Sequence, residues 1–171
     1  MFKKIIEGLE FSKVKLLRLF IISIIIIPLD QITKKIITLN VKLYTSIEVI
    51  PGFFDITHLL NKGGFFGFLS DQSIVIRIAV FLIFSGLATV LVLYYYFKIP
   101  YKIKTLSFAT ALIFAGAIGN LIDRVLFQQV VDFLDVYVMG WHWPAFNVAD
   151  CAISIGVTLF IYNMIFLKDE F

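Results

Sequence analysis

The chain has 171 residues, of which 60% are hydrophobic and only 16% are charged. Soluble domains have about 45–50% apolar and about 25% charged residues, so a lipid bilayer is the expected solvent for this chain. The net charge of +3 is too small to indicate nucleic-acid binding, and a single cysteine, Cys151, excludes an internal disulfide and a cysteine metal cluster. The length suits one domain.

Four segments are apolar enough to cross a bilayer, which takes about 20 residues of helix each. These predicted spans are residues 16–37, 74–97, 105–126 and 146–167. The first follows a basic tail, residues 1–15, as a signal peptide would. However, Pro28-Leu29-Asp30 stands where small residues would mark a cleavage site, so we interpret the segment as a retained anchor.

The distribution of basic residues predicts the orientation, because cytoplasmic loops are rich in Lys and Arg. The N-terminal region and the connection 98–104 are basic, whereas the longer connections 38–73 and 127–145 are mostly acidic. We expect both tails, 1–15 and 168–171, to be cytoplasmic. Lys34 and Lys35 are then at the outer end of the first span, where we expect them to extend toward water.

The connection 38–73 has the composition of a β-hairpin. Residues 43–50 and 53–57 are rich in β-formers, and Pro51-Gly52 between them is a turn signal. We predict a small antiparallel sheet on the outer membrane face, followed by a bend at residues 61–64. At the N-terminus, residues 2–9 carry apolar side chains with helical spacing. This pattern fits either an interfacial helix on the cytoplasmic surface or a frayed basic tail.

Polar residues near the predicted spans are candidate functional groups, because ionisable groups in a membrane are costly. With the predicted orientation they all lie toward the outer leaflet. They are Asp30 in the first span, Asn120, Asp123 and Arg124 in the third, Asp132 in the connection 127–145, and Asn147 and Asp150 in the fourth.

Small residues predict where two of the spans touch. Gly116 and Gly119 on the third span, and Ala149, Ala152 and Gly156 on the fourth, allow close helix contact. This contact would bring Asp150 near the chain segment that carries Asp132. Two adjacent carboxylates can share one proton, and such a pair can hydrolyse a peptide bond as base and acid without a metal.

Purely structural roles for these polar residues compete with the interpretation that they form a catalytic site. Asp123 and Arg124 could form a structural ion pair, Asp30 could cap or anchor a helix end, and Asn147 could be the N-cap of the fourth helix. Asp132 alone would read as an exposed loop carboxylate, whereas Asp150, inside a span, favours function. Spacing alone does not decide which two acids form the pair.

At these residues the sequence resembles the lipoprotein signal peptidase (signal peptidase II) family. Five blocks occur in the family's order on a chain with four predicted spans, and together they are highly specific. The blocks are Asp30-Gln31 with Lys34; Asn61 with Gly63, Phe66 and Gly67; Gly119-Asn120 with Asp123-Arg124; Val131-Asp132-Phe133; and Phe146-Asn147-Val148-Ala149-Asp150.

The resemblance implies an aspartic endopeptidase of the bacterial inner membrane that removes signal peptides from diacylglyceryl-modified prolipoproteins, just before the lipidated cysteine. It implies that Asp132 and Asp150 are catalytic, that four residues line the site, and that two acids support it. The lining residues are Asn61, Asn120, Arg124 and Asn147, and the supporting acids are Asp30 and Asp123. No metal or other cofactor is implied, and the partners are the prolipoproteins and membrane lipids.

The implied fold is an all-α membrane protein with four transmembrane helices, a small extracytoplasmic β-sheet and a short outer helix. Residues 134–145, with Trp141 and Trp143, would be that outer element, because aromatic residues suit the membrane interface. Two other functions compete with the peptidase. A small proton-coupled transporter would need carboxylates near the midplane and often has internal repeats, and a metal-dependent enzyme acting on lipid head groups would bind Mg²⁺ through its acids.

Overall fold

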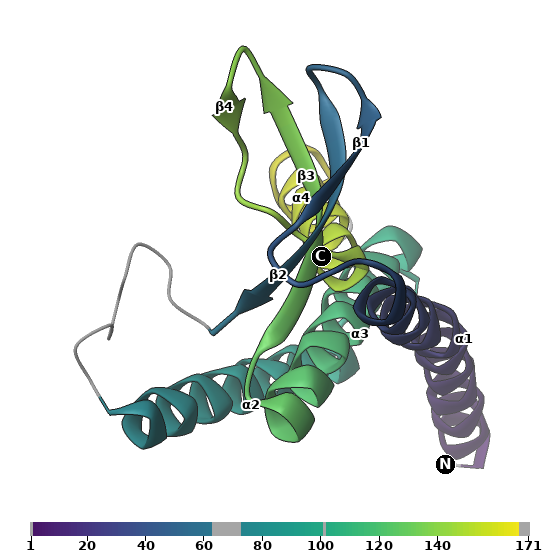
Figure 1. Ribbon diagram of the computed structural model, residues 1–171. Helices are drawn as coiled ribbons and strands as arrows, with labels where there is room; N and C mark the ends of the chain where they lie inside the picture. The colour runs from purple at the N-terminus through teal and green to yellow at the C-terminus, as the bar shows by residue number, and fades with distance from the viewer. Residues whose placement is uncertain (1, 63–72, 101, 168–171) are drawn as a thin grey trace.

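The computed structural model describes residues 2–62, 73–100 and 102–167, so Gly63, Gly64, Phe66 and Gly67 lie outside the described residues. Four helices and one four-stranded sheet account for most of the described chain (Figure 1). The helices are α1 (Phe2–Asn40), α2 (Ile74–Lys98), α3 (Lys104–Phe127) and α4 (Val148–Phe166). The strands are β1 (Ser46–Ile50), β2 (Phe54–Asn61), β3 (Val130–Val138) and β4 (Trp141–His142).

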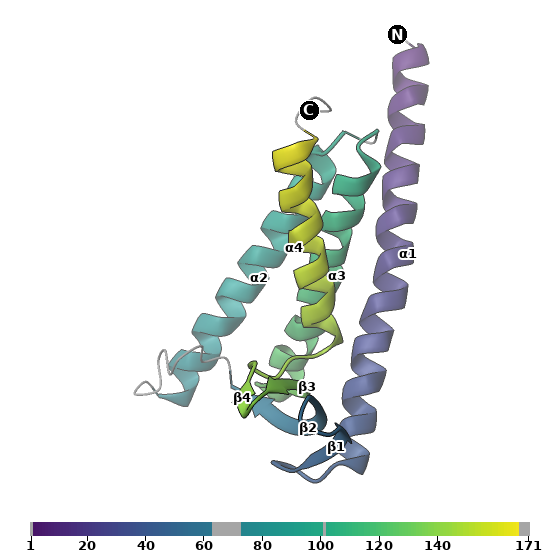
Figure 2. The same cartoon turned by 90° about the horizontal axis from the view of Figure 1, so that it is seen from above.

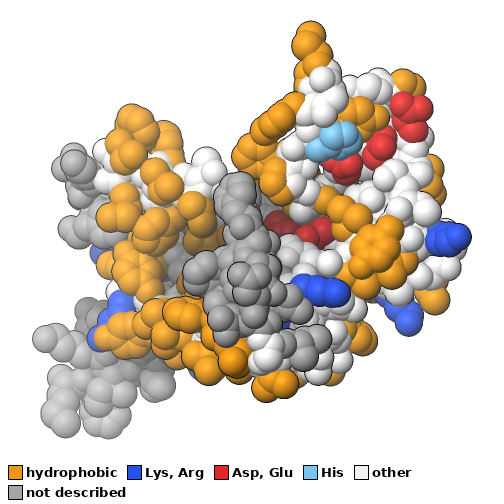
Figure 3. Space-filling view, turned by 60° about the vertical axis from the view of Figure 1, so that its left-hand side comes forward, with side chains coloured by type: hydrophobic (Ala, Val, Ile, Leu, Met, Phe, Trp, Pro, Cys, Tyr) orange, Lys and Arg blue, Asp and Glu red, His pale blue; other side chains and the backbone are white. Residues whose placement is uncertain are grey.

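All four helices contain a stretch that is long and apolar enough to cross a membrane, which confirms the four predicted helices. They run side by side, with the N-terminal end of α1 and the C-terminal end of α4 at one end and the sheet at the other (Figure 2). Large hydrophobic side chains such as Phe20, Leu91 and Ile161 point outward, and orange hydrophobic side chains cover wide areas of the surface (Figure 3). Lipid tails are a suitable environment for these side chains.

Helix α1 is longer than the predicted span, because the helix already begins at Phe2. This favours the helical alternative for the N-terminal residues. Lys15 near the start of the span is fully buried, and its ammonium group donates to the carbonyl oxygens of Phe97 and Ile99 at 3.0 and 2.6 Å. These carbonyls end helix α2, so a cation from α1 satisfies acceptors that the helix leaves unpaired.

Helix α3 is the central helix and packs against α1, α2 and α4. Glycine allows its close approach to α4, as the sequence predicted. A Cβ atom on Gly116 would clash with the carbonyl oxygen of Ala149, and one on Gly119 would lie 2.7 Å from Oδ2 of Asp30 and 3.3 Å from Cβ of Ala149. From the other side, a Cβ atom on Gly156 would lie 2.7 Å from the carbonyl oxygen of Ala109.

The predicted hairpin is confirmed as the antiparallel pair β1–β2, with a turn in which Gly52 has a φ of +73°. The sheet continues through β3 and β4 in the order β1-β2-β3-β4. The expectation of an outer helix at residues 134–145 is therefore wrong. Val130–Val138 is rich in β-branched and aromatic residues, and Met139 and Gly140 have φ of 50° and 78°, as a two-residue hairpin turn requires.

The contact between α3 and α4 predicts that Gly116→Ala destabilises the protein by about 1–3 kcal/mol, because the added methyl group meets the backbone carbonyl of Ala149 as well as the side chain of Ile153. Thermal unfolding in detergent measures this change. Gly86→Ala is the matched control, since a Cβ atom on Gly86 meets nothing within 4 Å and alanine favours the helix. Equal unfolding temperatures for the two variants would contradict the close packing of α3 on α4.

Candidate active site

The end of α3 directs the chain into the strand that carries Asp132. Helix α3 stops where Gln128 adopts a left-handed conformation with a φ of 60°, and β3 begins two residues later. Strand β3 pairs with β2 so that Asn61 lies beside this part of β3, opposite Val130. The Asn61 amide donates to Oδ2 of Asp132 at 2.9 Å. Asp132 is buried, with 4% of its surface exposed, so it is not an exposed loop carboxylate.

Backbone hydrogen bonds join the start of α4 to the same strand. Leu134 and Phe146 exchange two bonds, N to O in both directions, at 2.8 and 3.0 Å. The next residue, Asn147, is therefore held against β3. Its Nδ2 donates to Oδ1 of Asp132 at 2.7 Å, and Asn147 is fully buried.

Asn147 also forms the N-cap of α4, as one structural interpretation of the sequence predicted. Its Oδ1 accepts from the backbone N–H of Asp150 at 3.0 Å, and Oδ2 of Asp150 accepts from the backbone N–H of Asn147 at 3.2 Å. This reciprocal capping box satisfies two backbone donors at the positive end of the helix. One asparagine therefore contacts both Asp132 and Asp150.

Helix α3 supplies the remaining contact to Asp150. Nδ2 of Asn120 donates to Oδ1 of Asp150 at 2.8 Å. Both carboxyl groups thus accept from asparagine side chains, Asp132 from two and Asp150 from one.

The electrostatics place Asp132 and Asp150 in one site. The pKa of Asp132 is raised to about 6, first by burial and also by the nearby charge of Asp150. The hydrogen bonds from Asn61 and Asn147 and the charge of Lys34 act in the opposite direction on this pKa. A carboxyl group with a pKa this close to neutrality is able to gain and lose a proton under physiological conditions.

Arg124 does not pair with Asp123, so the alternative that these two residues form a structural ion pair is wrong. Its guanidinium donates to the carbonyl oxygen of Asn120 at 3.4 Å and lines a small cavity with Asn61. The cavity has a volume of about 10 Å³, enough for about one water molecule. Asp123 instead pairs with Lys34 at 2.8 Å.

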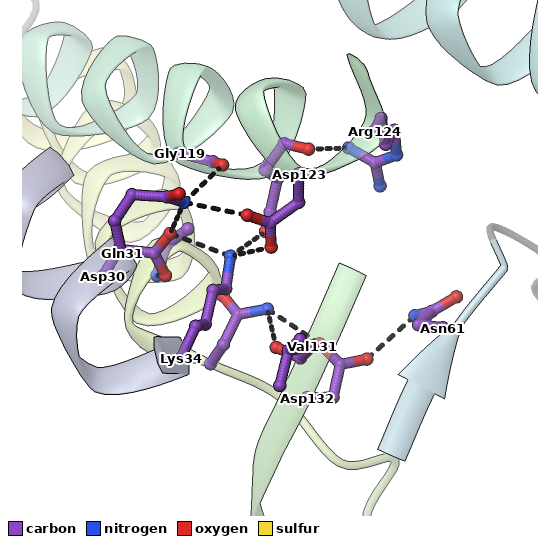
Figure 4. A network of polar contacts seen from close by, with 12 residues as sticks. Asp30, Gln31, Lys34, Asn61, Gly119, Asp123, Arg124, Val131 and Asp132 are labelled. Carbon is purple, nitrogen blue, oxygen red and sulfur yellow. Dashed lines mark hydrogen bonds and ion pairs between the residues drawn. The ribbon is translucent and has the colours of Figure 1, made fainter. Parts of the chain in front are cut away.

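Asp30 anchors the start of α4 from a different helix. Its Oδ1 accepts from the backbone N–H of Ala149 at 2.9 Å, and its Oδ2 accepts from Lys34 and Gln31 at 2.8 and 3.1 Å. The anchoring interpretation of Asp30 is therefore correct, although the helix end that it holds belongs to α4. Figure 4 shows Asp30 beside Gln31 and Lys34.

The expectation that Lys34 extends toward water is wrong, because Lys34 is 4% exposed and faces these acids. Lys35 beside it is exposed as expected. Lys34 and Gln31 belong to a block of the family resemblance, but neither was among the predicted site residues. The spacing of Asp30 and Lys34 by one helical turn was the signal that could have identified their contact.

Within the described residues, no group of three or more His, Cys, Asp or Glu side chains is arranged to hold a metal ion. The two histidines have other contacts. Nδ1 of His58 lies 2.8 Å from the carbonyl oxygen of Val41, and His142 pairs with Asp135 at 3.0 Å on the exposed side of the sheet.

Comparisons with known proteins agree with the resemblance seen in the sequence. The family described as signal peptidase (SPase) II matches residues 22–166. A lipoprotein signal peptidase from Desulforapulum autotrophicum is 50% identical over 90% of this chain and 94% of the relative. One from Geobacter sulfurreducens is 48% identical over 80% of this chain and 84% of the relative.

A solved structure of a bacterial membrane enzyme superposes on this chain with a TM-score of 0.76 and 35% sequence identity, covering 86% of this chain and 92% of the other. A second such structure gives a TM-score of 0.75 at 38% identity, covering 88% of both chains. Together with its four apolar helices, these matches identify the chain as a multi-pass membrane protein that belongs to the signal peptidase II family.

Proposed function

We propose that this protein is an aspartic endopeptidase that removes the signal peptide from diacylglyceryl-modified prolipoproteins, cleaving just before the lipidated cysteine, with Asp132 and Asp150 as its catalytic residues. The observation that carries the proposal is the position of Asn147. It donates to Asp132 and shares a capping box with Asp150, so carboxyl groups from β3 and α4 are held on one side chain.

The two carboxyl groups would work with one proton between them. The ionised member takes a proton from a water molecule, and the water oxygen bonds to the scissile carbonyl carbon. The protonated member gives its proton to the carbonyl oxygen, so a neutral tetrahedral intermediate forms. Breaking the C–N bond then returns a proton to the leaving amine. The raised pKa of Asp132 supports this role, because a dyad must keep one proton near neutral pH.

The other predicted site residues would orient the carboxyl groups and the substrate. Asn61 and Asn147 direct their amide N–H groups at Asp132, and Asn120 directs its own at Asp150. Arg124 adds a positive charge at this end of the molecule, where negative charge develops during hydrolysis. Asp30 and Asp123 would act on the frame of the site, through Ala149 and Lys34.

We further propose that the protein resides in the bacterial inner membrane with both termini in the cytoplasm and the sheet outside. The basic N-terminal region and the lysines of residues 98–104 support this orientation. Both helix ends that carry the termini lie opposite the sheet (Figure 2). Asp132 and Asp150 are at the sheet end, which favours the peptidase over a transporter with carboxylates at the midplane.

Replacing either catalytic aspartate tests this proposal. Asp132→Asn and Asp150→Asn should each lower kcat/KM for a lipidated precursor by at least about 10³-fold, because the dyad loses its acid or its base. A gel-shift assay with purified enzyme and a diacylglyceryl-modified precursor measures the cleavage. Asp135→Asn is the matched control, since Asp135 lies on the same strand but pairs with His142.

Turnover near the unsubstituted level in either dyad variant would refute the assignment of catalytic residues. The same assay with a chelator separates the peptidase from a metal-dependent enzyme, because loss of cleavage on chelation would favour the latter. Failure of the unsubstituted protein to cleave the lipidated precursor would refute the proposed function itself.

A second test uses the pH dependence of cleavage. The hydrogen bond from Asn61 stabilises the ionised form of Asp132, so Asn61→Ala should raise the pKa of Asp132 further. The dyad then keeps its proton to a higher pH, and the profile of kcat/KM against pH should move toward alkaline pH. Asn40→Ala is the control, because Asn40 is exposed and donates only to its own helix. A profile that moves toward acidic pH would contradict the assigned hydrogen bond.

A further inference from the structure

Lys34 is a buried cation between α1 and α3 with three polar partners. Its ammonium group lies 2.8 Å from Oδ2 of Asp30 and 2.8 Å from Oδ2 of Asp123 (Figure 4). It also lies 3.0 Å from Oδ1 of Asn120. The contacts with Asp30 and Asn120 are hydrogen bonds, and the contact with Asp123 is an ion pair. Two of the partners are acids that compensate for burying the charge. The third is a neutral amide, and ion pairing alone does not explain this contact.

The contact with Asn120 determines which way that amide points. An asparagine side chain has an oxygen that only accepts and a nitrogen that only donates. Because Lys34 occupies the oxygen, the nitrogen of Asn120 is directed at Oδ1 of Asp150, 2.8 Å away. If the amide were reversed, it would direct a donor at the lysine and an acceptor at the carboxylate. Lys34 is therefore joined to Asp150 through a single side chain.

We propose that Lys34 is a positioning residue for the dyad, which directs the Asn120 amide at Asp150 and supplies the positive charge that lets one dyad carboxyl group stay ionised. The inference rests on the proposed function and deepens it. It means that a residue of α1 influences the protonation of two carboxyl groups carried by β3 and α4.

The charges around Lys34 indicate the sign of its effect. Asp30 faces Lys34 from α1 and Asp123 faces it from α3, and the charge of Lys34 also acts on the dyad. The second nearby cation, Arg124 on α3, acts on Asp123 and on both acids of the dyad. With one proton on the dyad, this group has three negative and two positive charges. Without Lys34 the excess of negative charge grows, and the dyad binds protons more readily. The charge of Lys34 lowers the pKa of Asp132 against the larger effect of burial, which agrees in sign.

The pH profile of cleavage by Lys34→Gln tests the proposal. Glutamine can still donate to Asn120 but has no charge, so the profile of kcat/KM should move toward alkaline pH by about one unit, less than the shift expected from a directly contacting charge. Lys34→Arg keeps the charge and should keep the profile of the unsubstituted enzyme. Lys35→Gln is the matched control, because Lys35 is the exposed neighbour on the same helix, and its profile should not change.

The variant Lys34→Gln with Asp123→Asn restores the charge balance and should move the profile back toward that of the unsubstituted enzyme. This outcome would support an electrostatic role, whereas a purely structural lysine predicts further loss of activity without a return of the profile. The double variant also lacks the unpaired buried acid that could prevent Lys34→Gln from folding. Size-exclusion chromatography in detergent shows which variants fold.

An unchanged profile for folded Lys34→Gln would overturn the proposal, and so would failure of both the single and the double variant to fold. These results are distinct from failure of the proposed function. In that case, the unsubstituted protein would not cleave the lipidated precursor at any pH.

Discussion

The hydrogen bonds of Asn147 hold the site together, because they connect a helix end to a sheet. The same side chain caps α4 and donates to Asp132 on β3. If the first turn of α4 opened, Asp150 would lose its place and Asp132 would lose a donor in the same event. The structural interpretation of Asn147 as an N-cap and the functional one as a site residue are therefore compatible. Geometry needed for chemistry is obtained here from an interaction that the helix requires in any case.

The membrane environment explains why the polar residues form one connected group. Buried ionisable groups are costly without partners, and lipid offers none. Asp30, Lys34 and Asp123 compensate one another between α1 and α3, and Asn120 links this group to Asp150. The close approach of α3 to α4 at Gly116 and Gly119 makes these short contacts possible. The polar contacts of the site thus depend on the close helix packing that the glycines allow.

The four helices and the first hairpin could be predicted from the sequence, because each depends on a pattern of neighbouring residues. Long apolar stretches predicted the four helices, and the Pro51-Gly52 turn predicted the first hairpin. The choice of Asp132 and Asp150 as the proposed catalytic pair needed the family resemblance, since contacts between β3 and α4 are non-local. The outer helix at residues 134–145 was expected from that resemblance and from the tryptophans, although the β-branched pattern of β3 indicated a strand. The contacts of Lys34 with Asp30 and Asp123 were not predicted, because a lysine near a helix end ordinarily extends to water.

Gly119 shows how narrowly this region tolerates change. Its missing side chain leaves the space that Oδ2 of Asp30 occupies, and its carbonyl oxygen accepts from Gln31 at 3.1 Å. Asp30 in turn holds the second backbone amide of α4. One additional carbon atom on α3 would thus displace a carboxylate of α1 and release the beginning of α4. A substitution at Gly119 would therefore disturb α1, α3 and α4 together, although Gly119 itself has no side chain to contact a substrate.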